Sequence, residues 1–138
     1  MLFSRKPLVF VRSLCLLSAT LLTAFAFVTT ARAANPNNFQ VRTAADLVAL
    51  CGTDLSAPDY PQAIAFCHGY VVGAYAYYSA SAAADPNLRF VCLPNPAPAR
   101  SQAIADYLAW IKTRPNETAA PAIDSVFRYL GEHYPCKK

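Results

Sequence analysis

The sequence contains few of the residues on which catalytic and ligand-binding motifs depend. Among its 138 residues are only four glycines and two histidines. It has no phosphate-binding glycine run, no Gly-x-Ser-x-Gly element and no Cys-x-x-Cys pair, which argues against a nucleotide site, a serine hydrolase and a zinc or haem site. His68 directly follows Cys67, and adjacent side chains do not face each other in a helix. The sequence therefore favours a protein that is not an enzyme and uses neither a metal ion nor a cofactor.

The first 33 residues have the order of features found in a secretory signal peptide. Arg5 and Lys6 precede an apolar stretch over about residues 13–28, and residues 31–33 supply an Ala-x-Ala cleavage motif. The apolar stretch is short for a membrane span, which needs about 20 apolar residues, so a retained anchor is the less favoured alternative. We predict cleavage near Ala33 and export to the periplasm. The mature domain, residues 34–138, would then have no integral membrane segment.

The mature domain carries no net charge. Four of the twelve Lys and Arg residues lie in the predicted signal peptide, together with none of the eight Asp and Glu residues, so the formal charge of +4 falls to zero. A domain with equal numbers of basic and acidic residues offers no basic patch to bind nucleic acid or anionic membranes. Nucleic acid is therefore excluded as the expected partner.

The spacing of apolar residues predicts four helices and no sheet. Residues 43–46 form a capping box before a short helix that Gly52 can end. The second and longest helix should span about residues 61–82, the third about 99–113 and the fourth about 121–133. We expect an all-α domain resembling a small four-helix bundle, in which the last two helices form a hairpin.

The mature chain has four cysteines, an even number that predicts two disulfides in an exported protein. In an up-and-down arrangement, Cys51 and Cys67 lie toward one end of the bundle. Cys92, in a proline-rich connector, and Cys136, after the last helix, lie toward the other end. We therefore predict the pairs Cys51–Cys67 and Cys92–Cys136. Loop entropy assigns about 3 kcal/mol to the shorter loop and about 4 kcal/mol to the longer one, which rivals the whole stability of a small domain.

Tyrosines crowd the second predicted helix. Tyrosine combines apolar area with a polar tip and is enriched at protein interfaces. We assign Tyr75, Tyr77 and Tyr78 to a candidate interface, with the alternative that most of the tyrosines lie at the edge of the core. Gly69 and Gly73, one turn apart, predict that a neighbouring backbone approaches closely at this point.

Three blocks of sequence carry a family resemblance. They are Cys67-His68-Gly69-Tyr70-Val71-Val72-Gly73, then Cys92-Leu93-Pro94, and finally Pro135-Cys136. Together with weaker blocks they cover nearly the whole mature chain, which resembles the Rap/Tai family of type VI secretion immunity proteins. The resemblance implies that the framework positions are Cys51, Cys67, Gly69, Tyr70, Gly73, Cys92, Pro94 and Cys136.

The same resemblance implies a function. Characterised members are periplasmic, mostly helical and often dimeric, and they neutralise cell-wall-degrading effectors delivered by neighbouring bacteria. We therefore expect a non-enzymatic protein that binds and occludes an amidase-type peptidoglycan hydrolase, with a homodimer as one expected assembly. The alternative is a small periplasmic stress or chaperone-like binding protein. The resemblance does not identify the residues that contact the effector.

Overall fold

The computed structural model describes residues 31–137, so residues 1–30 of the predicted signal peptide lie outside the described residues. The α-helices are α1 (Ala44–Cys51), α2 (Tyr60–Ala84), α3 (Arg100–Lys112) and α4 (Ala122–His133). Short 3-10 helices precede or join them: η1 (Pro36–Gln40), η2 (Pro86–Leu88) and η3 (Pro115–Glu117). The described chain contains no strand and only two isolated β-bridges. The all-α fold predicted from the sequence is confirmed.

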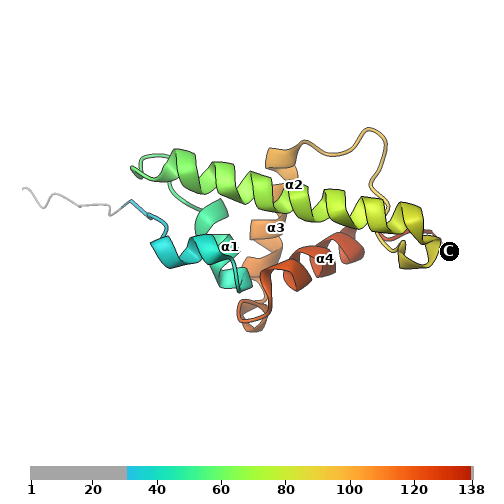
Figure 1. The fold of residues 1–138 in the computed structure, drawn as a ribbon. Coiled ribbons are helices and arrows are strands. Elements are labelled where there is room, and N and C mark those ends of the chain that lie inside the picture. Colours follow the sequence, from blue (N-terminus) through green and yellow to red (C-terminus); the bar gives the residue numbers. More distant parts are fainter. Residues whose placement is uncertain (1–30, 138) are drawn as a thin grey trace, which may run out of the picture.

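Helix α2 is the longest element and runs across the whole domain (Figure 1). In this view α1 lies below its first half, α3 crosses behind its middle, and α4 lies below its second half. Helix α1 contacts all three of the other helices. The core therefore lies along one side of α2, and its largest fully buried side chains are Leu47, Leu50, Cys67, Ile111 and Ser125.

The start of α1 is fixed by the predicted capping box. The Thr43 hydroxyl accepts a hydrogen bond from the backbone N–H of Asp46, and the Asp46 carboxylate accepts one from the backbone N–H of Thr43 at 3.0 Å. The same carboxylate accepts from Asn38 Nδ2 at 2.9 Å and from the backbone N–H of Arg42 at 3.2 Å. These hydrogen bonds, that from Asn38 above all, lower the pKa of the Asp46 carboxyl. Asp46 thus attaches the N-terminal segment to α1.

The end of α1 requires the glycine that the sequence places there. The N–H of Gly52 donates to the carbonyl of Val48 at 2.9 Å. A Cβ atom at position 52 would lie 2.9 Å from that same carbonyl oxygen, closer than such contacts occur. Gly52 therefore ends the helix because its bare α-carbon tolerates this approach.

Helices α3 and α4 follow each other along the chain and are joined by polar contacts as well as by apolar packing. Ser125 is fully buried. It shares a hydrogen bond with the Tyr107 hydroxyl at 2.7 Å and donates to the carbonyl of Ala122 at 2.8 Å. Near the C-terminal ends of both helices, Trp110 Nε1 donates to Glu132 at 2.8 Å. These bonds satisfy polar groups that would be costly to bury alone.

Both predicted disulfides are confirmed. Cys51–Cys67 joins the last residue of α1 to α2 and is buried. Cys92–Cys136 joins the connector after α2 to the end of the chain, where the N–H of Cys92 also donates to the carbonyl of Tyr134 at 2.8 Å. The chain on either side of α2 is therefore tied covalently to another part of the fold.

We expect the two disulfides to differ in their resistance to reduction. Cys92 is exposed, whereas Cys51 and Cys67 are buried, and reduction requires a thiolate to reach a sulfur atom. Under a mild reductant without denaturant, alkylation followed by peptide mapping should label Cys92 and Cys136 first. Labelling of Cys51 and Cys67 before the other pair would contradict this order.

The Asp46 contacts predict a stability difference that depends on pH. A lowered carboxyl pKa contributes stability that is present above the unfolded value, about 3.9, and is lost as the pH falls through the folded value. Asp46→Asn should therefore be less stable than the native protein at pH 6, and the difference should shrink at pH 2.5. Urea unfolding at the two pH values measures it. A difference independent of pH would show that the charge of Asp46 is not what matters.

Candidate protein-binding surface

Helix α2 contains no Asp, Glu, Lys or Arg over its 25 residues. A surface helix normally carries charged residues on its solvent side, and a helix that is apolar all round is normally covered on every side. In the described chain α2 is buried along one side only. We call the opposite side the outer face of α2, and its exposed residues are Ala65, Phe66, Gly69, Val72, Gly73, Ala76, Tyr77, Ala80, Ala83 and Ala84.

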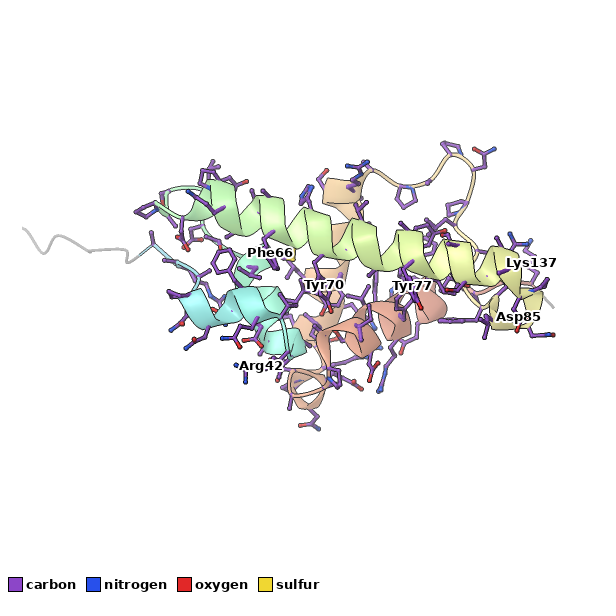
Figure 2. All side chains as sticks on the ribbon, in the orientation of Figure 1. Arg42, Phe66, Tyr70, Tyr77, Asp85 and Lys137 are labelled. Carbon is purple, nitrogen blue, oxygen red and sulfur yellow. A yellow bond between two sulfur atoms is a disulfide. The ribbon has the colours of Figure 1, made fainter. Side chains whose placement is uncertain are left out.

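Three aromatic side chains lie along one edge of this helix. Figure 2 shows Phe66, Tyr70 and Tyr77 on the edge of α2 that faces α1 and α4, as expected for residues spaced by four and seven positions. We call them the aromatic edge. Tyr77 is 79% exposed and Phe66 is 40% exposed. The Phe66 ring makes a T-shaped contact with Phe39, with 5.4 Å between the ring centroids, so the side chain is held on one side while part of its surface stays exposed.

Tyr70 connects the aromatic edge to α4. Its side chain is partly buried against the core. Burial and the nearby Asp124 carboxylate, on the first turn of α4, raise the pKa of the Tyr70 hydroxyl. The hydroxyl is a hydrogen-bond donor between Phe66 and Tyr77 on this edge.

The three tyrosines assigned to an interface do not form one surface. Successive helical residues point about 100° apart, and the structure separates them accordingly. Tyr77 lies on the outer face, and Tyr75 is partly buried. Tyr78 is only 9% exposed; its hydroxyl accepts hydrogen bonds from the N–H groups of Phe90 at 2.8 Å and Val91 at 2.7 Å. Its assignment to the interface is therefore corrected: Tyr78 holds the connector against α2.

Tyr75 lines a second feature, an apolar groove of about 360 Å³ between α2, α3, the end of α4 and the connector. Among the described residues, Arg100, at the start of α3, is the only charged one that lines it. The groove is bordered by Val71, Val72, Tyr75, Ala76, Leu93, Ala97, Pro98, Arg100, Ala103, Ile104, Leu130 and Tyr134. Val72 and Ala76 belong to both features, so the groove and the outer face are continuous.

The expectation of a close backbone contact at Gly69 and Gly73 is wrong within the described chain. Both glycines are exposed, and a Cβ atom added to either would meet nothing within 4 Å. Pro94, the other framework position outside the cysteines and Tyr70, is also exposed. The two glycines contribute no side chains to the outer face between Phe66 and Tyr77.

Sequence inspection missed Phe66. It lies outside the apolar stripe by which the second helix was predicted, and a large aromatic residue outside the core stripe is the signal that could have identified it. Its exposure became clear only when the positions of α1 and the N-terminal segment were known.

Two further properties of residues 31–137 bear on function. No group of three or more His, Cys, Asp or Glu side chains is placed to hold a metal ion in this part of the chain. None of its helices combines the length and the apolar character that crossing a membrane demands.

The chain folds into a small disulfide-linked helical domain in which one long helix lacks Asp, Glu, Lys and Arg. The family model of the Rap1a immunity proteins matches residues 43–136, and the chain belongs to this family. It is thus an effector-immunity protein, a class that is generally non-enzymatic, typically periplasmic and directed at a protein partner. No curated protein and no solved structure has significant similarity to the chain.

The structural role of Tyr78 can be tested against its neighbour. Tyr78→Phe should leave the N–H groups of Phe90 and Val91 without their acceptor, which costs about 1–3 kcal/mol for a buried group. Tyr77→Phe is the matched control, because the Tyr77 side chain is exposed. Thermal unfolding should show a clearly lower Tm for Tyr78→Phe only. Equal Tm values for the two variants would refute the role.

Proposed function

We propose that the protein is exported with cleavage of residues 1–33 and that, in the periplasm, it binds and occludes an amidase-type effector that degrades peptidoglycan. Membership of the Rap1a immunity proteins supports a protein effector as the partner. Two disulfides, one of them partly exposed, suit an oxidising compartment. Peptidoglycan lies in that compartment, so the effector would meet the inhibitor where it acts.

The outer face of α2 and its aromatic edge are the proposed contact with the effector. The observation that carries this proposal is the absence of Asp, Glu, Lys and Arg from α2. Binding there would bury apolar and aromatic area without removing water from a charge, which is the costly step at many interfaces. Tyr77 supplies an exposed aromatic residue of the kind that dominates binding energy in protein complexes.

The disulfides make this surface suitable for tight binding. Cys67 fixes α2 to α1, and the chain that follows α2 is fixed through Cys92. A surface that is already ordered loses less conformational entropy on association. Inhibition by occlusion consumes one inhibitor per effector, so the proposed activity is stoichiometric.

The same exposed face favours one other function, that of a periplasmic chaperone-like protein. Exposed apolar surface can bind unfolded clients as well as a folded partner. A chaperone would suppress aggregation of unrelated reduced or heated clients, whereas an immunity protein would inhibit one hydrolase at a ratio of one to one. Client aggregation and hydrolase inhibition, measured with the same preparation, separate the two functions.

Substitutions on α2 should weaken binding without unfolding the protein. Tyr77→Ala should weaken binding to the cognate hydrolase by about 10–100-fold, as for a central aromatic residue of an interface. Leu55→Ala is the control, because Leu55 is equally exposed, at 79%, but lies in the loop before α2. Affinity measured by calorimetry, and protection of cells that produce the hydrolase, should both fall for Tyr77→Ala and stay unchanged for Leu55→Ala.

A second pair of variants tests whether the missing charge matters. Ala80→Glu places a carboxylate on the outer face, whereas Ala109→Glu places one at an exposed position of α3. Ala80→Glu alone should abolish protection, because the carboxylate would be buried without a partner. Unchanged protection by both Tyr77→Ala and Ala80→Glu would exclude the outer face as the binding surface.

A further inference from the structure

Two segments of the chain meet at the predicted cleavage site. Ala31, Arg32 and Ala33 are exposed, whereas Ala34 is partly buried and packs against the core. The boundary between exposed leader and folded domain therefore falls at the Ala33–Ala34 bond. The loop between α1 and α2 contacts both sides of this bond.

Cleavage of the Ala33–Ala34 bond would affect the contacts on its two sides differently. On the leader side, the N–H of Arg32 donates to the Asp54 carboxylate, and the N–H of Asp54 donates to the carbonyl of Arg32 at 2.9 Å. On the domain side, the N–H of Ala34 donates to Asp59 Oδ2 at 2.9 Å. Removal of the leader removes both hydrogen bonds between Asp54 and Arg32 and leaves the bond between Ala34 and Asp59.

Asp59 has an unused acceptor at this point. Its Oδ1 atom is buried and has no hydrogen-bond partner among the described residues. Buried polar atoms are nearly always paired, and a carboxylate in which one oxygen receives a single N–H bond has spare capacity. The precursor amide offers only one N–H and no charge.

We propose that Asp59 is a receptor site for the α-ammonium group created by cleavage between Ala33 and Ala34. Hydrolysis breaks the C–N bond, with the oxygen of water passing to the Ala33 carbonyl carbon. At neutral pH, Ala33 leaves with the leader as a carboxylate, and the nitrogen of Ala34 becomes an ammonium group with three N–H donors.

The new ion pair joins the mature N-terminus to the start of α2. In the precursor only the acceptor of this hydrogen bond is charged, whereas after cleavage both partners are charged, and the additional N–H groups supply a donor for Oδ1. The methyl group of Ala34 is already packed against the core, so the ammonium group needs no large movement to reach Asp59. Maturation thereby replaces a hydrogen bond from a neutral amide with an ion pair and stabilises the first residues of the domain.

This inference rests on the proposed export and cleavage, and it is tested on protein purified from the periplasm of cells that express the full chain. Mass spectrometry should find Ala34 as the N-terminal residue. An amine-acylating reagent at pH 7 should then label the α-amine about tenfold more slowly in the native protein than in Asp59→Asn, which corresponds to a shift of about one unit in amine pKa. Asp54→Asn is the control and should label at the native rate, because the contacts of Asp54 leave with the leader.

A second variant leaves Asp59 unchanged. Two residues inserted between Ala33 and Ala34, and retained after cleavage, should displace the ammonium group, raise the labelling rate and lower the Tm by several degrees. Equal labelling rates in native protein, Asp59→Asn and the insertion variant would overturn the inference. That result would not affect the proposed function, whose test is protection against the hydrolase. A chain recovered with its leader uncut would instead overturn the export on which both rest.

Discussion

The structure depends on the covalent attachment of the chain on either side of α2. A helix without Asp, Glu, Lys or Arg would normally be enclosed by its own domain, but the described chain buries only one side of these 25 residues. The buried Cys51–Cys67 bond fixes α2 against α1, and Cys92–Cys136 fixes the connector that follows it. With these constraints, one side of α2 forms the core and the other side stays open to a partner. The side of α2 that packs in the core and the side proposed to bind the partner are therefore opposite sides of the same helix.

The elements could be predicted from the sequence because their signals are local. The capping box at Thr43, the glycine at position 52 and the apolar stripes gave four helices close to their observed bounds. The disulfide pairing also followed from the sequence, because only one pairing joins cysteines at the same end of the bundle. Each of these inferences needs only short-range spacing or chain order.

The binding surface could not be predicted to the same degree, because exposure depends on which side of α2 the other helices cover. Composition alone gave Tyr75, Tyr77 and Tyr78 similar roles. The observed packing instead places Tyr77 on the outer face, Tyr75 in the apolar groove and Tyr78 under the connector. Phe66 and Asp59 escaped notice for the same reason: their environments are created by the N-terminal segment, which has no periodic signal.

The central claim is that an effector covers the outer face of α2, and site-specific photo-crosslinking tests it most directly. A photo-reactive phenylalanine analogue at position 77 should give a covalent complex with the cognate hydrolase, while the same analogue at position 55 should give none. Crosslinking only from position 55, or from neither position although the complex forms, would contradict the account.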